Sequence, residues 1–327
     1  MRITYGPWGE TLAELVEAAR AAEDAGAEAV WLPELHRSAT VPAAAVAAGT
    51  RRAQVGTAIA LAFARSPMTT ALEALDLAEL SGGRFVLGLG TGVKRLNEDW
   101  HGVRWERPAA RLRETVAIIR HFAAHAASGE PMTVEGELAS LRVRGYRRPF
   151  PATPFPVYLA GTGPVMTGLA GEIADGWISH ELCSPAWLRE RALPLLRPGM
   201  DIVVSAACSI DDDPAEARRR AAGVAGFYAS VRTYADFFAF HDLAAEQNAV
   251  ADAFRARARA DGLAAAVPDR MVGALTLSGT AGQVADRIAD YAGHATTIKL
   301  TPPAHGLAPE EIRTAQARII DLIKELA

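Results

Sequence analysis

The sequence predicts a (β/α)8 TIM barrel with a helical insertion before the last βα unit. Short apolar runs alternate with amphipathic stretches along most of the 327 residues, which is typical of parallel strands joined by crossover helices. Hydrophobic residues make up 50% of the chain, enough for a large core. Eight strands separated by helices in about 250 residues, plus one insertion, fit a barrel better than an open doubly wound sheet.

The elements follow one another in a regular order. Strands are expected at residues 2–5, 28–32, 54–59, 84–89, 157–160, around Trp177, 202–210 and 297–300. Helices are expected at residues 11–25, 42–48, 67–80, 108–127, 164–173, 281–291 and 309–326. The first helix is indicated by Leu12, Leu15 and Ala19 at helical spacing, with Gly26 closing it. Prolines mark the first turn of several others.

The insertion is expected over residues of about 213–270, inside a single barrel domain that covers residues 1–327. Asp213 and Pro214 supply a helix start, and no clear strand follows for about sixty residues. Aromatic residues recur in this segment, among them Phe227, Tyr228, Tyr234, Phe237, Phe238 and Phe240. They are expected to pack against the barrel or a subunit partner, or in part to cover a substrate pocket.

The amino-acid composition argues against several classes of function. With 34 Lys plus Arg against 38 Asp plus Glu, the net charge of -4 provides no basic field for nucleic acid or anionic lipid, so neither partner is expected. The two cysteines, Cys183 and Cys208, lie in no metal-binding motif, and no metal cofactor is expected. No stretch approaches the ~18 apolar residues of a membrane span. A cytoplasmic location and no membrane partner are therefore expected.

A barrel places its active site where strands end and helices begin. One such junction is Gly161-Thr162-Gly163-Pro164, where small residues precede a helix with proline at its first position. A helix N-terminus opened in this way binds phosphate through its free N–H groups and its dipole. The alternative is a tight turn with a good cap. Gly6 and Ser179 follow two other strands and are further candidates for cofactor binding.

A second glycine cluster covers residues 88–92, GLGTG. It does not match a dinucleotide fingerprint, because Val93 occupies the third glycine's position and residues 94–105 are too polar and irregular to form a helix that starts at the turn. We expect Gly90, Thr91 and Gly92 to let a flat ring system lie against the strand end. The alternative is a crowded barrel rim.

Glu34 and His36 end the second predicted strand and are the candidate catalytic residues. His is suited to move protons near neutral pH, and Glu can orient it or bind a polar substrate atom. Without other context, such a pair is more often a surface or packing pair.

These segments together resemble the luciferase-like monooxygenase superfamily, and within it the oxidoreductases that use the deazaflavin coenzyme F420. The resemblance rests on residues 55–67 (VGTAIALAFARSP), 80–92 (LSGGRFVLGLGTG), 159–166 (LAGTGPVM) and 174–177 (ADGW). It implies a (β/α)8 barrel whose coenzyme lies across the C-terminal mouth, with its phosphate on the loop of Gly161, Thr162 and Gly163. It also implies a non-prolyl cis peptide at Ala58–Ile59 against the central ring of the coenzyme.

The resemblance favours an F420-dependent oxidoreductase that transfers a hydride between the deazaflavin and a small organic substrate. Several relatives place a catalytic His directly after the acidic residue of strand two, where this chain has Leu35, with His36 one residue later. One alternative is an FMN-dependent monooxygenase of the same superfamily. Another is a catalytically inactive binding protein on the same barrel. By the same resemblance a homodimer is expected, and the substrate remains open.

Overall fold

The computed structural model describes residues 1–256 and 260–327. Its parallel strands are those of the predicted (β/α)8 barrel, hydrogen-bonded in the order in which they occur in the chain. These strands are β1 (Arg2–Tyr5), β2 (Ala29–Leu32), β3 (Gln54–Thr57), β5 (Phe85–Gly90), β8 (Val157–Ala160), β9 (Gly176–Ile178), β10 (Asp201–Ile210) and β12 (Thr297–Thr301). The same path of paired strands joins β10 to β12 and β12 to β1, and one additional pairing joins β10 to β9. The fold class predicted from the sequence is confirmed.

The chain divides into two compact units. The first comprises Met1–Val30, Ser179–Leu195 and Asp201–Ala327. The second comprises Trp31–Ile178 and Leu196–Met200. That residues 1–327 form a single domain stays a prediction.

In the first unit, β12 lies between β1 and β10. Its register pairs Lys299 with Thr4 on one side and with Ser205 on the other. The helices of this unit are α1 (Leu12–Asp24), α6 (Pro185–Trp187), α7 (Pro214–Ala229), α8 (Ala235–Phe240), α9 (Ala244–Arg255), α10 (Asp269–Leu275), α11 (Ala281–Ala289) and α12 (Pro309–Leu326), with a short strand β11 (Leu277–Gly279) beside β10. Short helical turns η2 (Leu188–Ala192), η3 (Leu193–Leu195), η4 (Arg232–Tyr234) and η5 (Ala260–Ala266) complete it.

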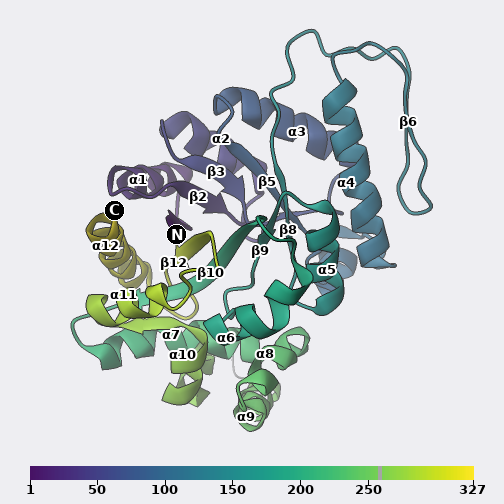
Figure 1. Cartoon of the computed structure of the whole chain (residues 1–327). Helices are drawn as coiled ribbons and strands as arrows, with labels where there is room; N and C mark the ends of the chain where they lie inside the picture. Colours follow the sequence, from purple (N-terminus) through teal and green to yellow (C-terminus); the bar gives the residue numbers. More distant parts are fainter. Residues whose placement is uncertain (257–259) are drawn as a thin grey trace. The chain divides into compact units, whose positions relative to one another are not determined.

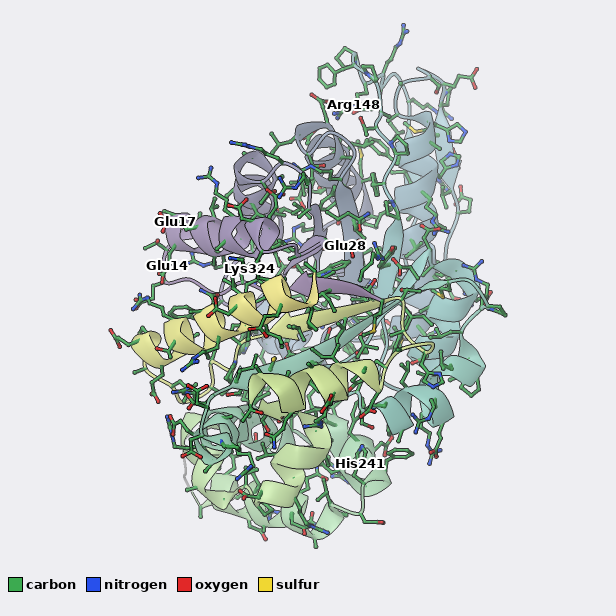
Figure 2. All side chains as sticks on the ribbon, turned by 60° about the vertical axis from the view of Figure 1, so that its left-hand side comes forward. Glu14, Glu17, Glu28, Arg148, His241 and Lys324 are labelled. Carbon is green, nitrogen blue, oxygen red and sulfur yellow. The ribbon has the colours of Figure 1, made fainter. Side chains whose placement is uncertain are left out.

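Arg313 on the last helix of this unit makes two charged contacts, one with the first helix and one with the segment just before it. Arg313 on α12 donates to Glu14 on α1 at 2.7 Å and also pairs with Glu10 just before that helix. Figure 2 shows Glu14 and Glu17 projecting from α1. Thr11 caps α1 by accepting a hydrogen bond from the Glu14 amide, which confirms the start of the helix predicted here.

The second unit contains the helices α2 (Thr40–Gly49), α3 (Pro67–Leu80), α4 (Pro108–His125) and α5 (Pro164–Ile173), the two-residue strand β4 (Ala60–Leu61) and a π-helical turn η1 (Leu96–Trp100). The hairpin of β6 (Met132–Val134) and β7 (Leu141–Val143) lies beside α4 (Figure 1). The expectation that residues 94–105 do not form a helix that starts at the turn was wrong, because the chain is helical from Lys94. Buried Asn97 in η1 donates to the carbonyls of Thr91 at 2.8 Å and Val93 at 3.0 Å, and these contacts stabilise a helical turn that apolar spacing does not indicate.

The segment predicted as an insertion is helical wherever it is described between 214 and 256 and between 260 and 275, apart from short turns. Asp213 accepts a hydrogen bond from the Ala215 amide, and Pro214 occupies the first turn of α7, as predicted. No described helix combines the length and the apolar character needed to cross a membrane.

Candidate active site

The glycines of β5 and its following loop pack against the segment between β3 and β4. A Cβ added at Gly88 would lie 1.9 Å from the carbonyl oxygen of Thr57, and one at Gly90 would lie 2.9 Å from Cδ1 of Ile59. At Gly92, where φ is +65°, a Cβ would lie 2.7 Å from Cδ2 of Leu61. The chain's own atoms therefore fill the space beside these glycines, which agrees with the crowded-rim alternative. A coenzyme-binding role for Gly90, Thr91 and Gly92 stays a prediction.

The Ala58–Ile59 peptide bond is cis, as the family resemblance implies. The backbone on both sides of it is held by the end of β2. Leu32 O accepts a hydrogen bond from the Ala58 amide at 2.9 Å, and Ile59 O accepts one from the Glu34 amide at 3.0 Å. The Glu34 carboxylate also accepts from the Leu61 amide at 2.7 Å. Contact of this segment with a coenzyme ring stays a prediction.

Both oxygens of Glu34 are engaged inside the second unit. Arg65 donates to Oε2 at 3.0 Å and also contacts Oε1, and its Nε lies 3.2 Å from Glu73. The Glu34 and Arg65 side chains are only 10% and 14% exposed, so this ion pair is largely shielded from water. Burial raises the pKa of Glu73, which shares Arg65 with Glu34. These contacts give Glu34 the geometry of a residue that positions the 58–61 segment, whereas His36, its partner in the sequence hypothesis, is exposed.

The Gly161–Gly163 junction opens the N-terminus of α5. Gly163 is the N-cap residue in an extended conformation, Pro164 follows in the first turn, and the Thr167 amide bonds back to Gly163 O at 3.0 Å. The first-turn amides before Thr167 precede the helical hydrogen-bond ladder and stay available to a ligand. A Cβ added at Gly163 would meet nothing within 4 Å, whereas one at Gly161 would lie 2.7 Å from the Thr167 amide nitrogen. The loop therefore has free space at Gly163 beside the first-turn amides, and phosphate binding by Gly161, Thr162 and Gly163 stays a prediction.

Ser179 and Gly6 belong to the first unit. The Ser179 hydroxyl accepts from the Ser205 amide at 2.8 Å and donates to His180 O at 2.9 Å, so its proton already has an acceptor within the chain. The Gly6 amide donates to Leu300 O at 2.9 Å. A Cβ on Gly6 would lie 3.0 Å from Thr301 Oγ1 and 3.7 Å from Lys299 Cε. Cofactor binding by Gly6 and Ser179 stays a prediction.

The first unit contains a polar cluster that was not assigned from the sequence. It consists of His180, Glu181, Tyr228 and Lys299. Tyr228 on α7 donates to Glu181 Oε2 at 3.2 Å, and Lys299 Nζ on β12 lies 3.8 Å from Glu181 Oε1. The Lys299 side chain is 7% exposed and that of Glu181 is 20% exposed.

Burial and the neighbouring charges together shift the pKa values of the ionisable groups in this cluster. Burial lowers the pKa of His180 to about 4, so its imidazole is neutral at pH 7. Burial alone would raise the pKa of Glu181, but Lys299 and neighbouring groups hold that pKa below its usual value. Burial also lowers the pKa of Lys299, although the Glu181 carboxylate opposes this. Clusters of perturbed ionisable groups are common at functional sites.

Aromatic residues of the insertion pack on this cluster. The ring of His180 lies 4.2 Å from that of Tyr234, 4.4 Å from that of Tyr228 and 5.5 Å from that of Phe237. These contacts with His180, which follows β9, agree with the expectation that the aromatic residues pack against the barrel, while a role at a subunit partner or over a substrate pocket stays a prediction. The available signal was Glu181 shortly after one strand and Lys299 in the middle of another, and these positions alone indicate no chemistry.

Comparison with known proteins places the chain in a family. The model of the luciferase-like monooxygenase family matches residues 2–297, and the chain belongs to this family. It is 30% identical to the 5,10-methylenetetrahydromethanopterin reductase of Archaeoglobus fulgidus over 289 residues, which cover 84% of this chain and 85% of that protein. It is 36% identical to a putative coenzyme F420-dependent oxidoreductase of Mycobacterium tuberculosis, over 54% of each chain.

Two further matches, one to a protein sequence and one to a solved structure, show how far the similarity extends. An uncharacterised protein of Mycobacterium tuberculosis is 35% identical over 58% of this chain, and the match spans only 56% of that relative's length. The solved structure of the coenzyme F420-dependent tetrahydromethanopterin reductase from Methanopyrus kandleri superposes with a TM-score of 0.80 at 20% identity, over 98% of this chain and 99% of that one. At this identity the structural match establishes the fold alone.

Proposed function

We propose that this protein is a coenzyme F420-dependent oxidoreductase that transfers a hydride between the deazaflavin and a small organic substrate. The observation that carries the proposal is the open N-terminus of α5 at Gly163, whose first-turn amides and free space fit the phosphate of such a coenzyme. Family membership and relatives that are named for this coenzyme or for a reductase support the same conclusion.

When bound, the coenzyme supplies the ring carbon that donates or accepts the hydride. The chain's own residues would bind, orient and shield the reactants. The Gly161–Gly163 loop would bind the phosphate, and Glu34 with Arg65 would hold the backbone of residues 58–61 in a fixed shape. His36 remains our candidate for a proton donor at the substrate, with the contacts of Glu34 favouring a positioning role for that carboxylate. A homodimer in the cytoplasm also stays a prediction.

Titration of the purified protein with F420 and, separately, with FMN tests the proposal by fluorescence. We expect F420 to bind and FMN to bind at least about tenfold more weakly, a difference of about 1.4 kcal/mol. Tight FMN binding without F420 binding would instead indicate a flavin-dependent monooxygenase. Failure of both to bind would indicate a protein that has kept the barrel without the redox function.

A further inference from the structure

The second unit contains a cavity of about 460 Å³ that is formed before β8 in the chain. It is lined by one residue just after α4 and by five consecutive residues of the segment that leads to β8, namely Ala127, Arg147, Arg148, Pro149, Phe150 and Pro151. The Gly161–Gly163 loop follows β8, at the strand end where a barrel has its active site. The cavity therefore belongs to the opposite end of this strand and is not part of the candidate active site.

Arg148 is held in one orientation at the wall of this cavity. Its side chain is 4% exposed, and Nη2 donates to Asp76 at 2.9 Å and to Glu79 at 3.1 Å, both on α3. Its amide donates to Ala126 O at 2.6 Å, at the end of α4. The ring of Phe150 lies over the guanidinium, with 4.7 Å between Cζ and the ring centre. Arg148, labelled in Figure 2, is thus oriented before a ligand arrives.

One donor of this guanidinium has no acceptor in the described part of the chain. Arg148 Nε is buried and has no hydrogen-bond partner among residues 1–256 and 260–327. A buried donor without an acceptor is costly, so we expect a ligand to bring an oxygen atom to Nε. The Phe150 side chain beside it is 51% exposed, and exposed side chains change rotamer rapidly, so its ring can turn to admit a ligand.

The charges around the cavity indicate a ligand with a single negative charge. Arg148 is already compensated by the carboxylates of Asp76 and Glu79, which do not line the cavity. Arg147, in contrast, is exposed, and no carboxylate of the described residues pairs with it. A monocarboxylate could pair with Arg147 and accept from Nε of Arg148. A phosphate dianion would bring a second negative charge close to the two acidic side chains.

The rest of the lining indicates the body of the ligand. Pro149, Phe150 and Pro151 contribute two pyrrolidine rings and a benzene ring, and Ala127 adds a methyl group. The volume lies in the range of cavities that bind small organic molecules, which typically combine apolar walls with a few placed polar groups. Flat aromatic ligands pack well on such rings. The lining therefore suits an aromatic body with one anionic end.

We propose that this cavity binds a small aromatic monocarboxylate. Its carboxylate pairs with Arg147 and accepts a hydrogen bond from Arg148 Nε, and its ring packs against Phe150 and the flanking prolines. This is a second ligand site, separate from that of the coenzyme, and it does not depend on the oxidoreductase function proposed above.

Isothermal titration calorimetry of the unaltered protein with benzoate tests the proposal. Benzyl alcohol keeps the ring without the charge, and inorganic phosphate keeps a charge without the ring. We expect benzoate to bind with one molecule per chain and each of the other two to bind at least about tenfold more weakly. The absence of saturable benzoate binding, or equal affinity for either comparison compound, overturns the proposal. Benzoate affinity should be the same with F420 present, and displacement of benzoate by F420 would place it in the coenzyme site and overturn the proposal.

Variants of exposed side chains identify the cavity without disturbing the buried ion pairs of Arg148. Arg147→Met should raise the dissociation constant of benzoate by about tenfold, and Phe150→Leu by about fivefold. Arg144→Met is the matched control, because Arg144 is exposed in the same segment and does not line the cavity, and it should leave the affinity unchanged. Unchanged affinity in Arg147→Met, or an equal loss in Arg144→Met, contradicts the proposal.

A crystal of the protein soaked with 4-iodobenzoate locates the ligand directly, because iodine gives an anomalous signal. We expect the iodine peak at this cavity, with the carboxylate within hydrogen-bond distance of both the Arg147 guanidinium and Arg148 Nε. An iodine peak elsewhere on the chain, or a carboxylate that points away from both arginines, would show that the assignment is wrong.

Discussion

Thr57 and Gly88 are joined by two hydrogen bonds through a single hydroxyl. Thr57 Oγ1 donates to Gly88 O at 2.7 Å and accepts from the Gly88 amide at 2.9 Å. A Cβ added at residue 88 would also lie only 1.9 Å from the Thr57 carbonyl oxygen. This pair therefore brings β5 directly against the last residue of β3, just before the 58–61 segment.

We predict that Gly88→Ala destabilises the protein by about 3 kcal/mol or more, because the added methyl group meets backbone that cannot move aside without breaking both hydrogen bonds. Urea denaturation measures the loss. Gly168→Ala is the control, since a Cβ at this helical position meets nothing within 4 Å, and it should be neutral or stabilising by up to about 1 kcal/mol. Equal stability of the two variants would contradict the packing described here.

Glu34→Gln separates a positioning role from a catalytic one. Gln keeps an oxygen for the Leu61 amide but loses the charge that pairs with largely buried Arg65, so we expect a loss of about 3 kcal/mol in the free energy of unfolding. Arg65→Met and the double variant complete a mutant cycle, in which the double variant should lose less than the sum of the single variants. If Glu34→Gln were fully stable yet inactive with substrate, Glu34 would be a catalytic residue, as the sequence hypothesis held.

Gly163→Val tests the phosphate loop without disturbing the fold. The residue is extended, and its Cβ position is free of contacts, so the free energy of unfolding should change by less than about 0.5 kcal/mol. The valine side chain would occupy space beside the first-turn amides, and we expect the F420 dissociation constant to rise by at least about tenfold. Gly161→Val is less informative, because its Cβ would collide with the Thr167 amide. Unchanged affinity in Gly163→Val would remove the phosphate assignment.

Stability should fall on acidification because of His180. Its pKa of about 4 in the folded chain lies below the 6.5 of an ordinary histidine, so the unfolded chain binds more protons between these pH values. The contribution of His180 to the free energy of unfolding is therefore complete above about pH 6.5 and is lost as the pH falls towards 4. The loss attributable to His180 between pH 7 and pH 5 should be about 2 kcal/mol. His180→Phe keeps an aromatic ring and should show a shallower fall over this range in urea denaturation. An identical pH dependence in both proteins would contradict the burial of His180.

The helices that open with proline were predictable from sequence, because proline at the first position and the caps mark their starts. The bounds of α3, α5 and α12 agree with the expected 67–80, 164–173 and 309–326. The hairpin of β6 and β7 was not predictable, because its strands are three residues each and Glu114 on α4 binds its turn, accepting from the amides of Leu138 and Ala139 at 2.7 Å. Such tertiary contacts have no local signature.

In the candidate site, too, some features could be predicted from the sequence and others could not. Glycine at strand ends could be read directly from the sequence, and the cis bond at Ala58–Ile59 followed from the family resemblance and is confirmed. The contact between Lys299 and Glu181 could not be read in this way, because the residues lie on different elements more than a hundred positions apart and only the fold brings them together. The engagement of Glu34 by Arg65 likewise depends on the path of the chain between β3 and α3.

The most direct test of the central claim is a crystal structure of the protein soaked with F420. We predict density for the coenzyme phosphate within hydrogen-bond distance of the amides at the start of α5, next to Gly163. A structure in which the phosphate lies elsewhere, or in which side chains close this helix end to the coenzyme, would contradict the account.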